Sequence, residues 1–338
     1  MESHPDRTNS TLSFVCCVEA GLLETQTVRM IQSLRRWGGC HADARVFAVK
    51  ARRGVALRPA TRAAFDDLQV DLVELNDPHE FSWFKFFNKP QAVAAAAERT
   101  DTAQLAWLDS DILIVREPSA LVLADGIDAM GCPSDREMAT SGPGDPYYGL
   151  WQANCAALGL NVDELPIVET YEEHEAIRMY WNGGVFSFRV GSAMSGSYRQ
   201  TCLDLLAARN VSMAEPHAIG IAEQSAVALG AVRAGLPIAQ LPYSHNYIMS
   251  PLSHDRWYDE QRLRDAHVVH YHGAMYDPDY FPTFVECLRR THPDVGEWIA
   301  GLGLITMDMP ILPRLANKAL RMYRDRKQDK FVATCPPR

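Results

Sequence analysis

Two carboxylates separated by one residue, Asp109 and Asp111, stand where a short apolar run ends, and they are the side chains of this chain best suited to chemistry. The run before them (residues 104–108) predicts a buried strand, and a second apolar run begins at residue 112. Burying two unpaired carboxylates is costly, so a cation is expected between them. A hard divalent ion would serve, with diphosphate oxygens and water in its remaining positions. The spacing alone is not specific, because one Asp could simply cap the next segment.

Two further motifs combine polar side chains with the start of a regular element. Asn182, Gly183 and Gly184 precede an apolar stretch with strand character. Glycines there permit a close approach of the backbone to a ligand, and the Asn182 amide could read hydroxyl groups, although a plain turn would have the same composition. Glu223 and Gln224 open a helical stretch, where an acidic side chain often only compensates the helix dipole.

Histidines and lysines supply the remaining polar candidates. His270 and His272 alternate along an apolar strand and so share one face of it, where an imidazole could complete a metal site or simply be hydrogen-bonded. The aromatic residues 83–90 also carry Lys85, Asn88 and Lys89. A lysine there could meet phosphate and Asn88 a base edge; equally, the segment could be a buried entry to a helix with two exposed lysines.

The elements that must position these side chains alternate between strand and helix. Strands are predicted over residues 12–18, 45–49, 70–75, 104–108, 184–189, 238–241 and 266–270, and helices over 24–37, 60–68, 86–98, 197–209 and 222–234. This alternation predicts an α/β fold with a mostly parallel, Rossmann-like central sheet and helices on both faces. Ligands of such sheets gather beyond the carboxyl ends of the strands, where Asp109 and Asp111 are expected.

Two segments differ from this pattern. Residues 134–180 hold a cluster of glycine and proline, several aromatics and an acidic stretch, which indicates an insertion over the sheet edge. Residues 314–330 contain seven basic residues against Asp325 and Asp329, with an apolar stripe of helical spacing. This segment is either a solvated helix packed on the domain or a helix that touches an anionic membrane surface.

Composition excludes several classes of protein. The 338 residues carry a net charge of −9, which argues against a basic face for nucleic acid. Eight cysteines show neither metal-ligand nor disulfide-framework spacing, so a reducing cytoplasmic setting is expected. Residues 1–11 are polar and predict a disordered start, not a signal peptide, and no run of about 18 apolar residues occurs.

The order of these motifs resembles the GT-A glycosyltransferases, in particular the retaining glucosyl- and galactosyltransferase family that includes bacterial lipopolysaccharide galactosyltransferases and glycogenin. That family carries Asp-x-Asp, then Asn-Ala/Ser-Gly-Val, then Asp-Gln-Asp, then His-x-x-Gly. The corresponding motifs here are Asp109-Ser110-Asp111, Asn182-Gly183-Gly184-Val185, Glu223-Gln224-Ser225 and His270-Tyr271-His272-Gly273. The Lys-Pro-Trp that follows in the family is replaced by Ala274-Met275-Tyr276.

The resemblance implies a set of roles for the site residues. Asp109, Asp111 and His270 would bind Mn²⁺ or Mg²⁺. Gln224 would lie near the anomeric centre and Glu223 would touch sugar hydroxyls. The other residues assigned to donor binding are Val18, Glu19, Lys85, Asn88, Lys89, Ser110, Asn182 and Gly183, of which Val18, Glu19, Asn88 and Lys89 would sit beside the nucleobase.

The same resemblance implies one GT-A catalytic domain over residues 12–312, followed by a basic helix or tail at 313–338. Within the domain, residues 12–133 would form the nucleotide-binding half and 181–312 the acceptor half, on either side of the insertion. The donor would be a nucleotide-sugar, by default a UDP-sugar, and the acceptor a small molecule or a glycan. Gln224 would support a retaining reaction, whereas Glu223 would be the general base of an inverting one.

Three other functions fit parts of the pattern. A haloacid-dehalogenase-like phosphatase also places Asp-x-Asp after a buried strand, although normally after the first strand of its domain. A nucleotidyltransferase shares the sheet and the metal, but the segment Val18-Glu19-Ala20-Gly21-Leu22 is not its glycine-rich basic loop. A nucleotide-sugar-binding domain without turnover is the third alternative, and metal-dependent hydrolysis of the donor would separate it from an enzyme.

Overall fold

A computed structural model describes residues 11–75, 79–209, 218–307 and 309–335. The predicted disordered start lies outside the described residues except for Thr11, and so do residues 336–338 of the predicted tail. Each strand and helix predicted from the sequence occurs, with its ends shifted by a few residues.

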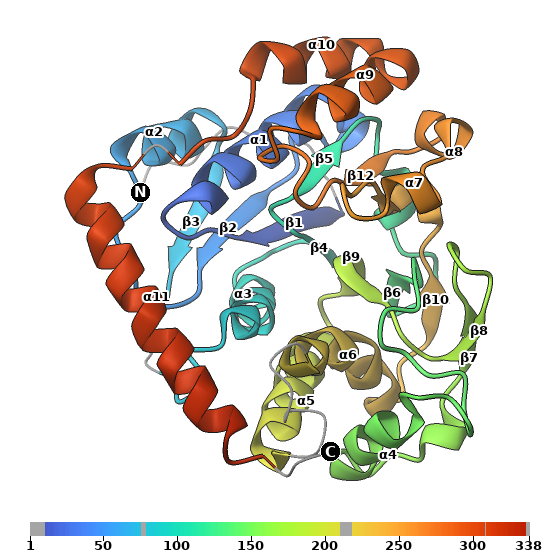
Figure 1. The fold of residues 1–338 in the computed structure, drawn as a ribbon. Coiled ribbons are helices and arrows are strands. Elements are labelled where there is room, and N and C mark those ends of the chain that lie inside the picture. Colours follow the sequence, from blue (N-terminus) through green and yellow to red (C-terminus); the bar gives the residue numbers. More distant parts are fainter. Residues whose placement is uncertain (1–10, 76–78, 210–217, 308, 336–338) are drawn as a thin grey trace.

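A seven-stranded sheet forms the centre of the molecule (Figure 1). Its strands, in spatial order, are β10 (Ile238–Gln240), β6 (Ala129–Cys132), β9 (Asn182–Arg189), β4 (Gln104–Leu108), β1 (Leu12–Cys17), β2 (Val46–Lys50) and β3 (Val70–Glu74). Strand β9 is antiparallel to both of its neighbours, and all other pairs are parallel. The predicted α/β class with a mostly parallel sheet is therefore confirmed.

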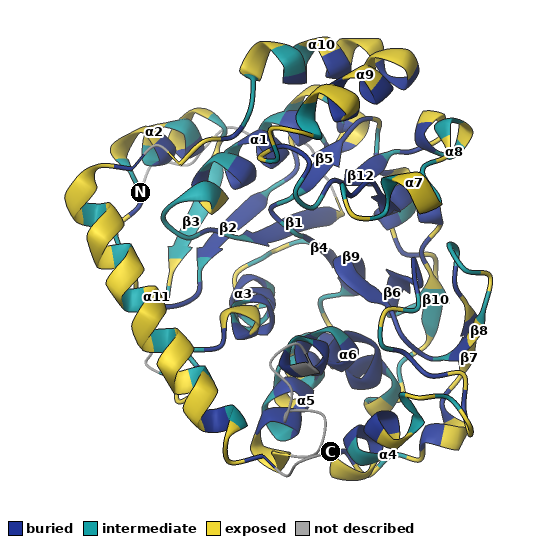
Figure 2. Ribbon diagram, in the orientation of Figure 1, coloured by how far each residue is buried: buried dark blue, intermediate teal, exposed yellow. Residues whose placement is uncertain are grey.

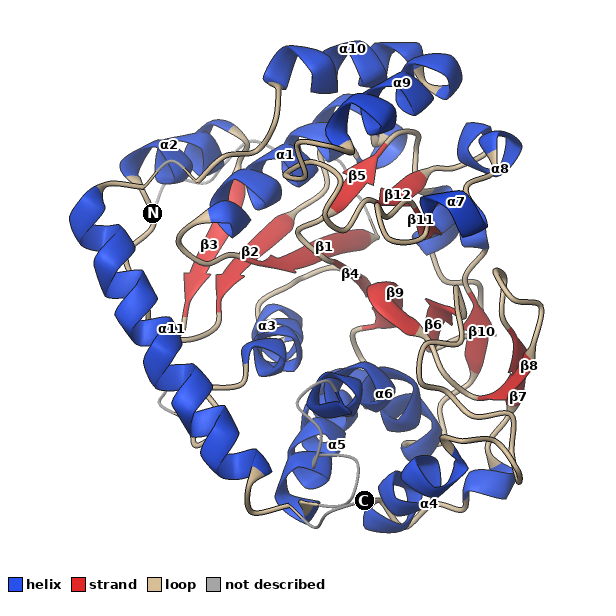
Figure 3. Ribbon diagram, in the orientation of Figure 1, coloured by secondary structure: helices blue, strands red, loops and turns tan. Residues whose placement is uncertain are grey.

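Helices cover both faces of this sheet (Figures 1 and 3). One face carries α1 (Leu22–Trp37), α2 (Pro59–Asp67), α9 (Phe281–Thr291) and α10 (Pro293–Leu302), and the other carries α3 (Asn88–Ala97), α5 (Met194–Ala208) and α6 (Ala218–Arg233). Alternate residues of β1 divide between two hydrophobic cores: Phe14 and Cys16 belong to one, and Val15 belongs to the other. This is the period-two alternation of a strand buried on both faces.

A second, three-stranded sheet brings the C-terminal third of the chain to the end of β4. It consists of β11 (Tyr247–Ile248), β12 (Val268–His270) and β5 (Ile112–Ile114), with β12 in the middle. Strand β12 runs antiparallel to β5, and His270 is in register with Ile112. Because β5 directly follows Asp111, this pairing places His270 beside the two carboxylates. The short helices α7 (His254–Trp257) and α8 (Glu260–Arg264) lie between β11 and β12 in the chain.

Residues 134–180 contain one helix and a small hairpin. Helix α4 (Tyr148–Ala157) contributes to the same core as α5, and β7 (Ile167–Glu169) pairs with β8 (Ala176–Arg178). Glu172, in the hairpin turn, accepts a hydrogen bond from the Tyr243 hydroxyl and so ties the segment to the chain after β10. The remaining short elements in the described ranges are the 3₁₀ turns Gly39–His41, Lys85–Phe87, Ser119–Leu121, Val162–Glu164 and Tyr243–His245.

The basic C-terminal segment forms the long helix α11 (Ile311–Val332), which is exposed over most of its length (Figure 2). Its anchors include a hydrogen bond from the Arg324 guanidinium to the carbonyl of Arg53 and two further contacts. Asn317 Nδ2 donates to the carbonyl of Ala20 at 3.1 Å, and the buried ring of Phe331 packs against Phe81 and Trp83, with centroids 5.8 and 5.0 Å away. Within the described ranges, no helix is both long and apolar enough to cross a bilayer.

Candidate functional site

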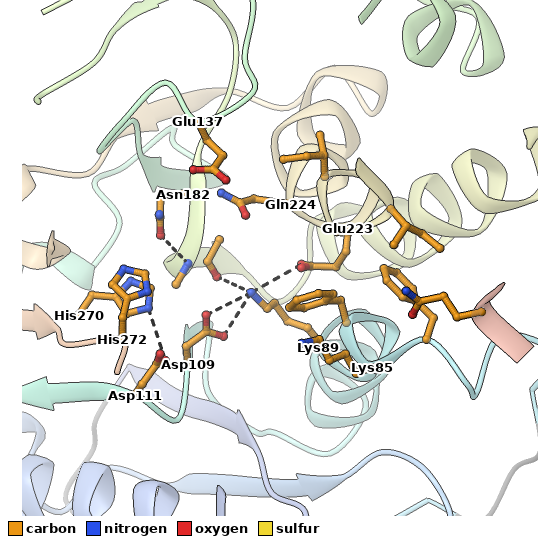
Figure 4. Close-up of a pocket in the computed structure, with 18 residues that line it drawn as sticks. Lys85, Lys89, Asp109, Asp111, Glu137, Asn182, Glu223, Gln224, His270 and His272 are labelled. Carbon is orange, nitrogen blue, oxygen red and sulfur yellow. Dashed lines mark hydrogen bonds and ion pairs between the residues drawn. The ribbon is translucent and has the colours of Figure 1, made fainter. Parts of the chain in front are cut away.

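A pocket of about 480 Å³ opens beyond the carboxyl end of β4, bounded by β9, β12, α3 and α6 (Figure 4). Its walls include ten residues singled out in the sequence: Lys85, Lys89, Asp109, Asp111, Asn182, Gly183, Glu223, Gln224, His270 and His272. Figure 4 shows Lys89 between Asp109 and Glu223, and the two imidazoles above Asp111. Segments far apart in the chain thus meet in one cavity.

Backbone pairing between neighbouring strands sets the positions of the acidic residues. The amide of Asp109 donates to the carbonyl of Gly184 at 2.9 Å, and the amide of Tyr271 donates to the carbonyl of Asp111 at 3.0 Å. A glycine is required at 184, because a Cβ atom there would lie 2.3 Å from Cε1 of His270. Gly184, where the sequence predicted a close approach of the backbone to a ligand, therefore makes room for the side chain of His270.

Asp109 is paired with a lysine of the chain. Lys89 Nζ lies 3.2 Å from Asp109 Oδ1 and 3.7 Å from Glu223 Oε1, and it donates to the carbonyl of Gly183 at 2.9 Å. Trp107 Nε1 donates to Asp109 Oδ1 at 2.8 Å. The cation expected beside the carboxylates is thus, for Asp109, an ammonium group. Lys89 is buried, unlike the exposed lysine that one interpretation of the sequence allowed.

These groups shift one another's pKa values. Burial opposes the charge on Lys89, but the carboxylates of Asp109 and Glu223 outweigh it and raise the lysine pKa. Burial also raises the pKa values of Asp109 and Glu223, against the opposing effect of Lys89. Lys89 therefore stays protonated at neutral pH and supplies the positive charge of this side of the pocket.

Asp111 faces two histidines on the other side. His270 Nε2 lies 3.4 Å from Asp111 Oδ1, and the rings of His270 and His272 stack with centroids 4.1 Å apart and planes at 15°. One ligand atom from each of the three residues lies within 4.8 Å of the others. His270 Nδ1 is buried and has no hydrogen-bond partner in the described part of the chain. The prediction that Asp111 and His270 meet at a strand end agrees with this arrangement.

The electrostatics of this group favour an ionised Asp111 and a neutral His272, whereas they raise the pKa of His270. Burial alone would raise the pKa of Asp111, but His270 outweighs it and lowers that pKa to about 2. Burial lowers the pKa of His272 to about 3, and the neighbouring His270 contributes to the shift. Burial acts against the charge on His270 as well, yet Asp111 raises its pKa above the ordinary value.

The amide of Asn182 is oriented by three hydrogen bonds. Its Oδ1 accepts from the Gly184 amide at 3.0 Å and from Asn246 Nδ2 at 3.1 Å, and its Nδ2 donates to Asp135 Oδ2 at 3.3 Å. Burial raises the pKa of Asp135 to about 7, with Glu137 contributing to the shift. Asn182 therefore presents a fixed amide to the pocket. Asp135 was not singled out in the sequence, because nothing local marks it.

Glu223 and Gln224 lie in the second turn of α6 and do not open it, because the helix begins at Ala218, and both side chains are held by tyrosines. The hydroxyl of Tyr198 donates to Glu223 Oε1, and Gln224 Nε2 is hydrogen-bonded to the Tyr180 hydroxyl. Glu223 is buried, whereas Gln224 is partly exposed to the cavity. Gln224 is thus the more accessible of the two candidates for contact with a reacting group.

Of the residues predicted to lie beside a nucleobase, Lys89 lines the pocket, whereas Glu19 and Asn88 are hydrogen-bonded to each other outside it. Asn88 Nδ2 donates to Glu19 Oε1 at 2.9 Å, and Arg52 Nη2 donates to Glu19 Oε2 at 2.9 Å. Burial acts to raise the pKa of Glu19, but Arg52 outweighs it and lowers the value. Val18 is fully buried, and neither it nor Glu19 nor Asn88 is among the described residues that line the 480 Å³ pocket.

Two other predicted donor-binding residues have different environments. Lys85 is exposed at the pocket, with its Nζ 4.6 Å from the ring centre of Phe86. Ser110 Oγ donates to the Cys17 carbonyl at 2.8 Å and accepts from Thr27 at 3.2 Å. Ser110 therefore fastens the turn between the two carboxylates to β1, and the part of the pocket wall that the structure describes does not include it.

The pocket also contains residues that the sequence did not single out. These are Phe84, Phe86, Glu137, Ile219, Gly220, Ile221 and Gln328. Glu137 comes from the 134–180 segment and adopts a φ of 40°, and Gln328 reaches in from α11. No local sequence signal marks either side chain, because both reach the pocket through long-range packing.

Comparisons with known proteins agree with the glycosyltransferase resemblance. Residues 14–235 match the model of the Rhodobacterales glycosyltransferase domain family. No curated protein sequence matches the chain. Among solved structures, the galactosyltransferase LgtC in complex with donor and acceptor sugar analogues is similar at 15% identity, covering 89% of this chain and 99% of that one, with a TM-score of 0.47. Mouse xyloside xylosyltransferase 1 is similar at 10% identity, covering 77% and 97%, with a TM-score of 0.44.

The family match alone decides the assignment. It extends from β1, through the Asp-Ser-Asp segment and the Asn-Gly-Gly strand, to the end of α6. Because it spans well over half of the chain, the protein belongs to the Rhodobacterales glycosyltransferase domain family and is a glycosyltransferase.

Proposed function

We propose that the enzyme transfers a sugar from a nucleotide-sugar, by default a UDP-sugar, to a hydroxyl group of a small-molecule or glycan acceptor, with Mn²⁺ or Mg²⁺ as cofactor. One observation carries this proposal: Asp111 and His270 share a single cavity with Asn182 and Gln224, in a chain of a glycosyltransferase family. The cavity lies at the carboxyl end of a parallel strand, where α/β proteins bind nucleotides.

The donor atoms present fit a divalent cation. Ligands about 2.1 Å from one ion are separated from each other by about 3.0–3.4 Å, and His270 Nε2 and Asp111 Oδ1 are 3.4 Å apart. Asp109 is the third proposed ligand, and its pairing with Lys89 supports a negatively charged carboxylate at the mouth of the metal site. When bound, such an ion neutralises charge on the departing nucleotide diphosphate.

The hydrogen bonds of the pocket support retention of configuration at the sugar. Glu223 is engaged by Tyr198 and faces Lys89 at 3.7 Å, so it is poorly placed to take a proton from an acceptor. Gln224 is partly exposed to the cavity, so its amide can support the reacting face of the sugar. Asn182 and Gly183 contribute a fixed amide and a short backbone segment for the sugar hydroxyls.

We place the nucleotide at the Glu19 end of the sheet. Val18, Glu19 and Asn88 lie together at the end of β1 and the start of α3, and Ser110 fixes the adjoining turn. The exposed Lys85, at the pocket, is available for phosphate. In this arrangement the diphosphate would extend from the Glu19 cluster to the metal, while Lys89 orders Asp109 and Glu223 beneath it.

We further propose that residues 12–312 act as one catalytic unit, with the 134–180 segment on the acceptor side. Glu137 supports this, because it extends from that segment into the pocket and is drawn next to Gln224 in Figure 4. We also propose that α11 touches an anionic membrane on the cytoplasmic side. Its exposed apolar side chains alternate with basic ones, and Ile311, Leu312 and Leu315 are 66%, 78% and 57% exposed.

Thermal denaturation with nucleoside diphosphates, each with and without Mn²⁺, tests the proposed activity. A ligand present at 100 times its dissociation constant stabilises the folded state by about 2.7 kcal/mol. We expect one nucleotide to raise the melting temperature only with Mn²⁺, and Asp111→Ala to abolish the shift. Asp125→Ala, at an exposed position outside the pocket, is the matched control and should keep the shift. A shift that is independent of metal would contradict the proposal.

Hydrolysis of the identified nucleotide-sugar in the absence of acceptor then separates turnover from mere binding.

For the membrane contact, we expect the protein to sediment with phosphatidylserine vesicles at low salt and to be released as salt screens the charges. Binding that persists with neutral vesicles, or that survives replacement of Lys318, Arg321 and Lys330 by Gln, would argue against an electrostatic contact through α11.

A further inference from the structure

Among the residues that the structure describes, two pairs of histidines stack, and their surroundings differ. His245 and His267 stack with centroids 4.5 Å apart and planes at 19°, and both rings are fixed by the backbone. His267 Nδ1 is hydrogen-bonded to the carbonyl of Glu117, and His245 Nε2 accepts from the Ala120 amide at 3.1 Å. Ordinary structural hydrogen bonds therefore account fully for this pair.

The pair His270 and His272 lacks such bonds. The partner of His270 is Asp111, and in the described part of the chain no hydrogen bond to the ring of His272 is found. Both imidazoles line the main pocket, and their ligand atoms lie within 4.8 Å of each other and of an Asp111 oxygen. Hydrogen bonds within the described part of the protein therefore do not explain the position of the His272 ring.

The backbone conformation at His272 also suggests a role beyond structure. His272 has a φ of 46°, in the left-handed region that non-glycine residues rarely adopt. Its conformation turns the chain at the end of β12 so that the ring lies against His270, at a separation of 4.1 Å. Such outliers persist where the surrounding structure imposes them, and they are concentrated at ligand-binding positions.

We propose that His272 is a metal ligand, and that Asp111, His270 and His272 together hold a divalent transition-metal ion before any nucleotide binds. This inference rests on the proposed function, in which Asp111 and His270 already bind metal, and it adds a second imidazole. Asp109 is not needed for this nucleotide-free site, because its charge is already paired with Lys89.

The ligand set also determines which metal is preferred. Two imidazole nitrogens and one carboxylate suit Mn²⁺, Fe²⁺, Co²⁺ or Zn²⁺, whereas Mg²⁺ favours sites built from oxygen atoms. The protein should accordingly bind Mn²⁺ and Co²⁺ in the absence of nucleotide, and a large excess of Mg²⁺ should displace them poorly.

Two measurements on the nucleotide-free, full-length protein test the proposal. The first is calorimetric titration with Mn²⁺ and Co²⁺ of the wild type, His272→Ala and the control His267→Ala, which removes one ring of the other stacked pair. We expect His272→Ala to weaken binding at least 10- to 100-fold, the loss typical of residues that only support a ligand. The control should bind like the wild type.

The second measurement needs no variant. The electron-spin-echo spectrum of Mn²⁺ bound to the wild type should contain couplings to two imidazole nitrogens, and a single coupling would overturn the proposal. Equal affinity of wild type and His272→Ala would overturn it as well. In either case, retained Mn²⁺-dependent nucleotide binding would leave the proposed function standing. Nucleotide binding without any need for metal would instead contradict the proposed function.

Discussion

Replacement of Lys89 by Met removes the buried cation of the pocket while keeping a straight side chain of similar length. The change leaves Asp109 and Glu223 without their positive partner. The exposed fraction of the side chain is 10% for Lys89, 25% for Asp109 and 3% for Glu223. Breaking a buried ion pair by removing one partner costs about 3–5 kcal/mol. Because Asp109 is partly exposed to solvent, the lower end, about 3 kcal/mol, is expected.

The expected loss depends on pH in a defined direction. Burial already raises the pKa values of Asp109 and Glu223 above those of the unfolded chain, and removal of Lys89 raises them further. From about pH 4 up to those raised values, the folded state therefore binds more protons than the unfolded state, so stability falls as pH rises. The difference between wild type and Lys89→Met should be smallest near pH 5 and largest near pH 8.

Calorimetric or fluorimetric melting at several pH values measures this effect. A loss of 1 kcal/mol lowers the melting temperature of a large domain by about 2 °C, so a decrease of roughly 6 °C is expected near pH 8. Lys85→Met is the matched control, since it removes the same charge from an exposed lysine at the same pocket. Equal shifts in the two variants, or a difference that does not change with pH, would refute the assignment of Lys89 as the buried counter-ion.

Three further predictions concern other parts of the structure. Gly184→Ala should lower the free energy of unfolding by about 1–3 kcal/mol through overpacking, since its Cβ would lie 2.3 Å from His270 Cε1. Gly183→Ala should cost much less, because its Cβ would meet only the end of the Lys89 side chain, at 3.1 Å. Urea unfolding of both variants measures the contrast, and equal losses would contradict it. Asp135→Asn should become more stable relative to the wild type as pH rises from 5 to 8. The pKa of Asp135 is raised to about 7 in the folded state, so the wild type must take up a proton on folding and loses stability as pH rises towards that value, whereas Asn does not titrate. A constant difference in unfolding free energy across this range would be evidence against a buried carboxyl with a raised pKa. Phe331→Ala should loosen α11 by about 3 kcal/mol, because the buried ring packs on Phe81 and Trp83. Hydrogen exchange should accelerate in residues 311–332 and stay unchanged in α1, and unchanged protection of α11 would show that its anchor lies elsewhere.

The sequence predicted the central fold well because its signals are local. A strand buried on both faces appears as a continuous apolar run, and the carboxylates that follow β4 stand out against it. The parallel sheet then places Asp109 and Asp111 at a ligand-binding edge without knowledge of any contact. Strand β5, by contrast, is three residues long, and its pairing with β12 outside the central sheet depends on which edges remain free after the core has packed.

The pairing of charges was the part of the site that the sequence could not decide. Lys89 could have been an exposed lysine or a phosphate ligand, because its neighbours in the chain are the same in either case. Its position beside Asp109 and Glu223 arises from α3 and α6 approaching the end of β4, in contacts that span 20 and 134 residues of the chain. Asp109 and Asp111 thus have different protein partners, a lysine for one and a histidine for the other, and the sequence did not indicate this division.

The pairing of β12 with β5 also bears on what the smallest working form of the enzyme can be. The family match ends at residue 235, yet His270 and His272 lie beyond it, and so does Gln328. A version of the protein shortened to the matched region would lose the β12 edge that covers Ile112–Ile114 and would expose these buried residues to water. Shortening would thus remove one wall of the pocket together with β12, the strand that pairs with β5 next to Asp111. The part of the chain that forms the pocket is therefore longer than the matched segment and extends as far as α11.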